Sequence, residues 1–277
     1  MGIIEPRNIF QLDDMDKDLR TALFNRLFDF FNSTWEGENP YIPLEESSCY
    51  GYLSASKAAV NIWADCWKRP MDEWSGVCAY FLQDLKDYII ESQWNEVYDL
   101  IEFILNDYQS NRLSSALNSA LEKEMSGYRI VGKEVVPISD ECELRALEES
   151  LAVEEGFAGA RTHISSALKK LALRPEPDLR NAVKEAISAV ESAACVVTGN
   201  TDATLGKALN VLESQGRLHP ALKSAWSKMY GYTSDENGIR HALSGADPCV
   251  DFATAKYMVV SCAAFVNLLV ASTQAAI

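Results

Sequence analysis

Apolar residues recur at the spacing of an α-helix along almost the whole chain, and this periodicity limits the fold more than any other feature. The clearest stretch is 94–106, where one apolar stripe is made by Val97, Leu100, Ile101, Ile104 and Leu105. The pattern changes at Gly127. Residues 128–131 and 134–138 read as strands on either side of the turn Gly132-Lys133, which predicts a short β-hairpin. Because a hairpin this small is marginal alone, we expect it to pack on helices.

The length and composition favour two helical domains. The chain has 277 residues, of which 48% are hydrophobic and 23% charged, so it can bury a sizeable core. We expect a mainly α fold, with a first domain at 1–155 that is closed by the hairpin near 128–138. A helix over 139–155 would join it to a second, helical domain at 156–277.

Individual helices can be placed from apolar spacing and from breaks in it. In the first domain we expect helices at 15–31, from near Ser54, at 74–88 and at 94–106. In the second domain the break at 174–177 contains two prolines, and Asp178 is well placed to cap the helix that follows. The helices expected there cover 163–173, 178–197, 202–212, 220–229, 234–244 and 251–272.

The charge is unevenly distributed. Residues 1–150 hold 13 Lys and Arg against 28 Asp and Glu, which accounts for the whole net charge of −15. Residues 151–277 hold 12 of each sign. Because an acidic surface repels phosphate backbones, any RNA contact is expected in the second domain, and a protein partner is the expectation for the acidic first domain.

Cysteine and histidine usage argues against a metal or disulfide scaffold. The seven cysteines form no CxxC pair, and the three histidines show no ligand spacing with them. We therefore expect no metal and no cofactor, and a reducing cytoplasm. No secretory leader is evident after Met1. The apolar run at 257–277 is interrupted by polar residues, so a buried helix is expected there instead of a membrane span.

Four strings in the second half resemble the HEPN-like domain of AbiJ-type abortive-infection proteins. They lie at 177–192, 204–209, 230–242 and 255–267, and the third contains Gly238-Ile239-Arg240-His241. The first half is similar to the N-terminal domain of the same proteins. That match rests on residues 11–16, 19–20, 98–104 and 127–130.

This resemblance implies a HEPN-like helical bundle, a homodimer and a role in halting phage infection. Many HEPN members are metal-independent ribonucleases with an R-x4–6-H motif. The motif's His can move a proton at the ribose 2′-OH or the leaving 5′-oxygen, and its Arg can stabilise the phosphoryl charge. Arg240 and His241 are the candidate catalytic pair here. The supporting or substrate-contact candidates are Glu191, Asp235, Glu236, Asn237 and Gly238.

The sequence departs from the motif, which leaves two hypotheses open. Gly245, Ala246 and Asp247 stand where the motif requires His, and the nearest His is the immediate neighbour of Arg240. Adjacent residues on a helix point about 100° apart and do not share a face. The first hypothesis is a ribonuclease that uses Arg240 and His241. The second is a HEPN-fold dimer without catalysis that binds or senses a partner in phage defence.

Other polar residues of the second domain can be interpreted as structural or as functional. Glu191 lies in the otherwise apolar stretch 189–194, where it either touches solvent or pairs with Arg240. His163 is expected at the surface of a helix, and His219 at a helix start before Pro220. The Lys169-Lys170 pair is expected on a solvated helix face, with phosphate binding as the alternative.

Overall fold

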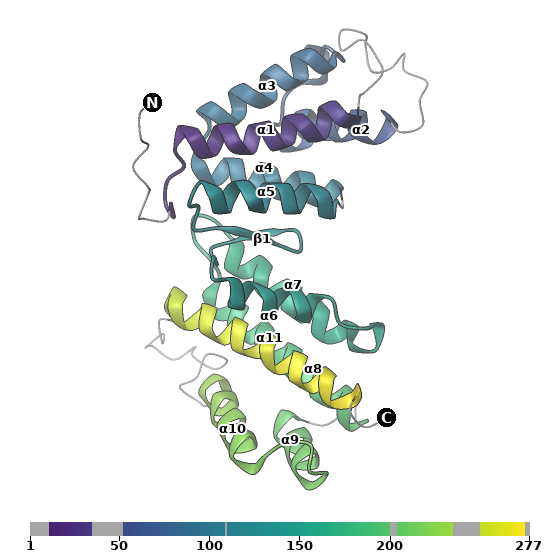
Figure 1. Cartoon of the computed structure of the whole chain (residues 1–277), viewed down its shortest axis with the longest axis vertical. Helices are drawn as coiled ribbons and strands as arrows, with labels where there is room; N and C mark the ends of the chain where they lie inside the picture. The colour runs from purple at the N-terminus through teal and green to yellow at the C-terminus, as the bar shows by residue number, and fades with distance from the viewer. Residues whose placement is uncertain (1–10, 35–51, 109, 200–203, 235–249, 275–277) are drawn as a thin grey trace. The chain divides into compact units, whose positions relative to one another are not determined.

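The structure, a computed structural model, is mainly α-helical and divides into two compact units (Figure 1). It describes residues 11–34, 52–108, 110–199, 204–234 and 250–274. The first unit is Met1–Ser139 and the second is Asp140–Ile277. In the described residues the α-helices are accompanied by a single two-stranded sheet. The predicted fold class is thereby confirmed.

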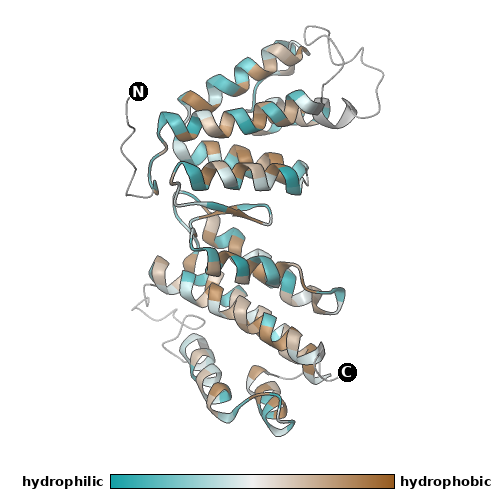
Figure 2. Ribbon diagram, in the orientation of Figure 1, coloured by the Kyte–Doolittle hydropathy of each residue, from teal (hydrophilic) through white to brown (hydrophobic). Residues whose placement is uncertain are grey.

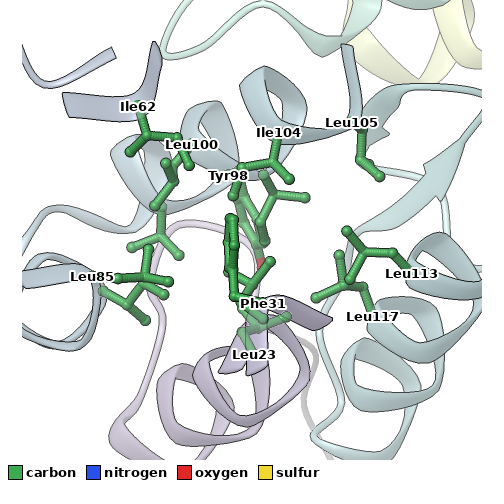
Figure 3. Packing of buried hydrophobic residues seen from close by; sticks show 14 of the residues in the cluster. Leu23, Phe31, Ile62, Leu85, Tyr98, Leu100, Ile104, Leu105, Leu113 and Leu117 are labelled. Carbon is green, nitrogen blue, oxygen red and sulfur yellow. The ribbon is translucent and has the colours of Figure 1, made fainter. Parts of the chain in front are cut away.

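The first unit packs its helices around one aromatic and aliphatic core. Its elements are α1 (Lys17–Thr34), α2 (Tyr52–Asn61), a π-helical turn (Ile62–Cys66), a 3-10 turn (Met71–Glu73), α3 (Cys78–Glu91), α4 (Trp94–Asp107) and α5 (Asn111–Lys123). Figure 3 shows how these helices bring their apolar faces together around Phe31 and Tyr98. The stripe predicted on 94–106 is buried as expected, since Val97, Leu100 and Ile101 are fully enclosed.

The predicted hairpin is present and completes the first unit. Strand β1 (Arg129–Val131) pairs antiparallel with β2 (Glu134–Val136), and Gly132 in the turn has φ 65°. Helix side chains satisfy the outward backbone groups of both strands. Asn118 donates to the Ile130 carbonyl at 2.9 Å and accepts from its N–H at 2.7 Å. Glu102 accepts from the Val135 N–H at 2.6 Å, so neither edge is left unpaired at these positions.

Two details of the first unit differ from the sequence-based expectation. The helix expected from Trp74 begins at Cys78, because Trp74 is extended and Gly76 adopts a left-handed φ of 68°, which a continuing helix cannot contain. Helix α5 was not anticipated. Its buried residues Leu113, Leu117 and Leu121 follow the i, i+4, i+8 spacing of an amphipathic helix, so the signal was present in the sequence.

The second unit is a bundle built on the antiparallel pair α7 and α8. Its helices are α6 (Glu141–Leu151), α7 (Ala158–Ala172), α8 (Leu179–Thr198), α9 (Leu205–Ser214), α10 (Pro220–Ser234) and α11 (Phe252–Gln274). Asp178 caps α8 as predicted, since its carboxylate accepts from the Asn181 N–H at 3.2 Å. Helix α6, which we expected to join the two domains, packs on α11 and α7 inside this unit.

Helix α11 is the most apolar helix of the second unit, as its brown and pale turns in Figure 2 show. By length and composition Phe252–Thr273 would be able to cross a membrane. Its packing is that of a core helix, because Ala255, Val259 and Cys262 are fully buried among the neighbouring helices α8, α6 and α7. The ring of Phe265 also stacks on Trp226 of α10 at 3.9 Å. The expectation of a packed helix at 257–277 therefore agrees with the described part of this segment.

Candidate functional site

The candidate catalytic pair lies in the connection between α10 and α11. Arg240 and His241, together with Asp235, Glu236, Asn237 and Gly238, fall outside the residues that the structure describes. The helix expected at 234–244 falls outside them too, apart from Ser234. Ser234 was expected to begin that helix, but it is the last residue of α10, which runs five residues beyond the predicted end at Met229.

The described residues on both sides of this connection are anchored by hydrogen bonds. Thr233 is fully buried, and its hydroxyl donates to the Tyr230 carbonyl at 2.8 Å. Asp251 caps α11 by accepting from the Thr254 N–H at 2.7 Å, and its hydrogen bonds with Thr254 lower the pKa of its carboxyl. Lys256 then binds Glu143 of α6 at 2.8 Å. The start of α11 is therefore tied to α6 by an ion pair, and the end of α10 is buried at Thr233.

Glu191 lies on α8, where it is half-buried. Its neighbour Ser192 faces Gly159 of α7 so closely that a Cβ at position 159 would collide with the Ser192 hydroxyl. The two helices thus approach closely near Glu191. The hypothesis that Glu191 pairs with Arg240 involves a residue outside the described part of the chain and stays a prediction.

A histidine–carboxylate pair joins α7 to α8, and sequence reasoning did not find it. His163 Nδ1 lies 2.8 Å from Glu185 Oε2, with side chains 40% and 23% exposed. His163 is at a partly exposed helix surface, as expected, but it is not isolated. A carboxylate at Nδ1 orients the imidazole ring. The Asp178 N–H donates to the Lys170 carbonyl, and the helix register set by this turn places 163 opposite 185. Sequence periodicity does not give that register.

The remaining Arg and His candidates of the second unit have structural contacts. The guanidinium of Arg217 donates to the Val197 carbonyl at 3.2 Å and to the Ser272 carbonyl at 3.1 Å, which ties the end of α8 to α11. His219 Nδ1 accepts from the Ala221 N–H at 3.2 Å, so this residue caps α10 and the expected position at a helix start is confirmed. Lys169 and Lys170 lie in the last turn of α7, where positive charge suits the helix dipole.

Three cysteines of the described residues have thiols whose pKa is raised by burial. Burial raises the pKa of Cys66 to about 11, with Asp99 adding to the shift, and raises that of Cys78 to about 12. Burial also raises the pKa of Cys262, which is fully enclosed by the bundle. These thiols are small core hydrophobes at neutral pH. No group of three or more His, Cys, Asp or Glu that could hold a metal ion occurs within the described ranges.

Comparison with known proteins assigns the first part of the chain. Residues 1–153 match AbiJ N-terminal domain 4, a span that covers more than half of the chain and ends just after α6. The chain is therefore an AbiJ-type protein. An AbiJ domain indicates a role in abortive infection, which is a form of phage defence. Within that class it belongs to the AbiJ N-terminal domain 4 family. Searches of curated proteins and of solved structures found no significant match.

Proposed function

We propose that this abortive-infection protein is a cytoplasmic, metal-independent ribonuclease whose second unit is a HEPN-like bundle. The observation that carries the proposal is the position of the four HEPN-like strings on that bundle. String 177–192 forms most of α8, 204–209 begins α9, 230–234 ends α10, and 255–267 contains most of the buried residues of α11. Strings separated by many residues in the sequence thus belong to helices of one compact unit.

The proposed reaction is an attack of the ribose 2′-OH on the adjacent phosphorus, with departure of the 5′-oxygen. His241 takes the proton of the 2′-OH or returns one to the leaving oxygen, because an imidazole exchanges protons near neutral pH. Arg240 stabilises the negative charge that develops on the phosphoryl oxygens. The products are a 2′,3′-cyclic phosphate and a 5′-hydroxyl, and no metal is consumed or required. The charge balance of residues 151–277 suits this substrate better than the acidic first half does.

We further propose that the protein is a homodimer that pairs through α11. The exposed side of this helix carries an apolar stripe made by Ala253, Tyr257, Ala264, Leu268 and Ala271. Tyr257 is 60% exposed and Leu268 is 45% exposed, on a helix that is otherwise well buried. Antiparallel pairing of two copies would set Tyr257 against Leu268 of the partner subunit, with small residues between them. A closed two-fold contact of this kind covers the stripe on both copies.

Cleavage of total bacterial RNA by the purified chain in excess EDTA tests the proposed function. The wild-type protein is expected to produce fragments that end in a 2′,3′-cyclic phosphate. This product is identified by a phosphate at the 3′ end that phosphatase does not remove. Fragments that carry a 3′-hydroxyl, or cleavage that stops when EDTA is added, would contradict the proposed chemistry. A folded dimer that cleaves no RNA in any condition would favour the second candidate function.

That second candidate is a non-catalytic HEPN-fold module that binds or senses a partner during phage infection. Two observations favour it: Asp247 stands where the catalytic motif could supply His, and residues 1–150 are strongly acidic. An acidic domain suits a basic protein partner and not RNA. Under this hypothesis His241→Ala leaves phage protection in cells unchanged, whereas the ribonuclease hypothesis requires that protection be lost.

A further inference from the structure

A hollow of about 340 Å³ lies in the first unit, between the second half of α1 and the beginning of α5. This volume is at the lower end of the range typical of small-molecule sites. Apolar side chains of Phe30, Leu113 and Ala116 form part of its lining. The polar part of the lining is made by Arg26, Asp29, Ser33, Ser110 and Arg112. These residues lie on α1, on α5 and at the cap of α5, and the two helices pack directly on each other.

Two arginines give the hollow a positive charge within the acidic half of the chain. Arg26 lies 3.6 Å from Asp29, and both side chains are about half or more exposed, so this ion pair is weak. Arg112 forms no hydrogen bond or ion pair with any residue that the structure describes. One carboxylate against two guanidinium groups leaves a local net charge of about +1, and a guanidinium is well suited to bidentate binding of phosphate.

The serines and Asp29 add directional groups beside the arginines. Ser110 Oγ accepts from the Leu113 N–H at 3.2 Å as the cap of α5, and its own hydroxyl proton remains to be donated to a ligand. Ser33 Oγ donates to the Phe30 carbonyl at 3.1 Å, which leaves its lone pairs as acceptors. The Asp29 carboxylate can accept from sugar hydroxyls. The lining thus offers donors for an anion and acceptors for hydroxyl or amino groups.

The aromatic part of the lining is held in place by other rings. Phe30 meets Phe31 edge-on at 5.3 Å and Tyr108 edge-on at 5.0 Å, and Phe31 is fully buried. Such edge-to-face contacts fix the plane of the Phe30 ring. An aromatic ring held in place beside Arg26 and Arg112 suits a ligand in which a planar ring is joined to a phosphate.

We propose that this hollow binds a nucleoside 5′-monophosphate. Arg112 and Arg26 bind the phosphate, Ser110 donates to it, and Asp29 accepts from the ribose hydroxyls. The base packs on Phe30. This proposal uses only residues of the first unit, so it can hold whether or not the second unit cleaves RNA.

Isothermal titration calorimetry on the full chain tests the site with AMP, GMP, CMP and UMP separately, and with adenosine and inorganic phosphate as partial ligands. At least one monophosphate is expected to bind at least tenfold more tightly than either partial ligand. Arg112→Gln is expected to weaken that binding by about tenfold to a hundredfold, since it removes hydrogen bonds to a charged group. Arg145→Gln is the matched control, because Arg145 is an exposed arginine of α6 that pairs with Glu141 at 3.1 Å.

Three results would overturn the proposal. The first is a wild-type chain that binds none of the four monophosphates at millimolar concentration. The second is equal binding by the wild type and by Arg112→Gln, when circular dichroism shows both to be folded. The third is binding of inorganic phosphate as tight as that of every nucleotide, which would leave no role for the ring against Phe30.

Discussion

The two units of this chain are stabilised by different kinds of contact. The first unit combines an aromatic core with buried polar groups: Arg129 is 8% exposed and its guanidinium donates to the carbonyls of Ser126 and Tyr128, while the Tyr98 hydroxyl bonds to Ser126 at 2.9 Å. Burial lowers the pKa of Arg129. The second unit brings helices together through small residues, with Ala182, Ala186, Ala189 and Ala193 of α8 all fully enclosed.

This difference indicates which region can change without loss of the fold. Buried polar groups must keep their partners, because an unpaired group is costly, so the hairpin region of the first unit tolerates little substitution. The second unit relies on close helix packing through the small residues of α8. We infer that a change at the hairpin of the first unit costs stability through lost hydrogen bonds, whereas a change at the α8 interface of the second unit costs stability through lost packing.

The largest expected effect on stability is a cavity in the first core. Leu23→Ala removes a fully buried side chain of α1 and should lower the free energy of unfolding by about 2–5 kcal/mol. Urea unfolding followed by tryptophan fluorescence measures this change, because most of the tryptophans lie in residues 1–139. Phe28→Ala serves as the control, since that side chain is 38% exposed. Equal loss in both variants would mean that α1 does not pack as described.

A smaller cost is expected from removing the side chain that completes the hairpin. Asn118→Ala leaves the buried N–H and carbonyl of Ile130 without their partner, which should cost about 1–3 kcal/mol. Asn106→Ala is the control, because the Asn106 side chain is exposed and donates to the carbonyl of Glu102 one turn before it, so the change should be within about 0.5 kcal/mol. Hydrogen exchange at Ile130 reports the same loss locally. Unchanged protection at Ile130 in Asn118→Ala would contradict this role.

The third prediction concerns association and should leave the fold of the second unit intact. Leu268→Glu places a charge on the proposed α11 stripe and should convert a dimer into a monomer of 30.7 kDa. Light scattering at micromolar concentration measures the mass. Leu222→Glu makes the same substitution at an exposed leucine of α10, 38% exposed, and should keep the dimer. A monomeric wild type, or a dimeric Leu268→Glu variant, would exclude pairing through this stripe.

Sequence patterns predicted the parts of the fold that depend on local rules. The turn Gly132-Lys133 indicated the hairpin, because glycine readily adopts the positive φ that the turn requires. The break before Asp178 indicated the start of α8, because proline cannot continue a helix. Long-range pairing was harder to predict. The His163–Glu185 contact depends on the register of two helices, and the use of Asn118 as a partner for a strand depends on tertiary packing. Periodicity shows which face of a helix is apolar, but it does not show which residues of other elements that face contacts.

We propose that the second unit cleaves RNA with Arg240 and His241. The most direct test of this proposal is the rate of RNA cleavage by the full-length variants in excess EDTA. We predict that His241→Ala and Arg240→Ala each reduce the rate by about 10²–10⁴ without unfolding the chain. Arg145→Ala, at an exposed arginine of α6, should retain the wild-type rate. Wild-type rates in both His241→Ala and Arg240→Ala would contradict the claim and remove these two residues from the mechanism.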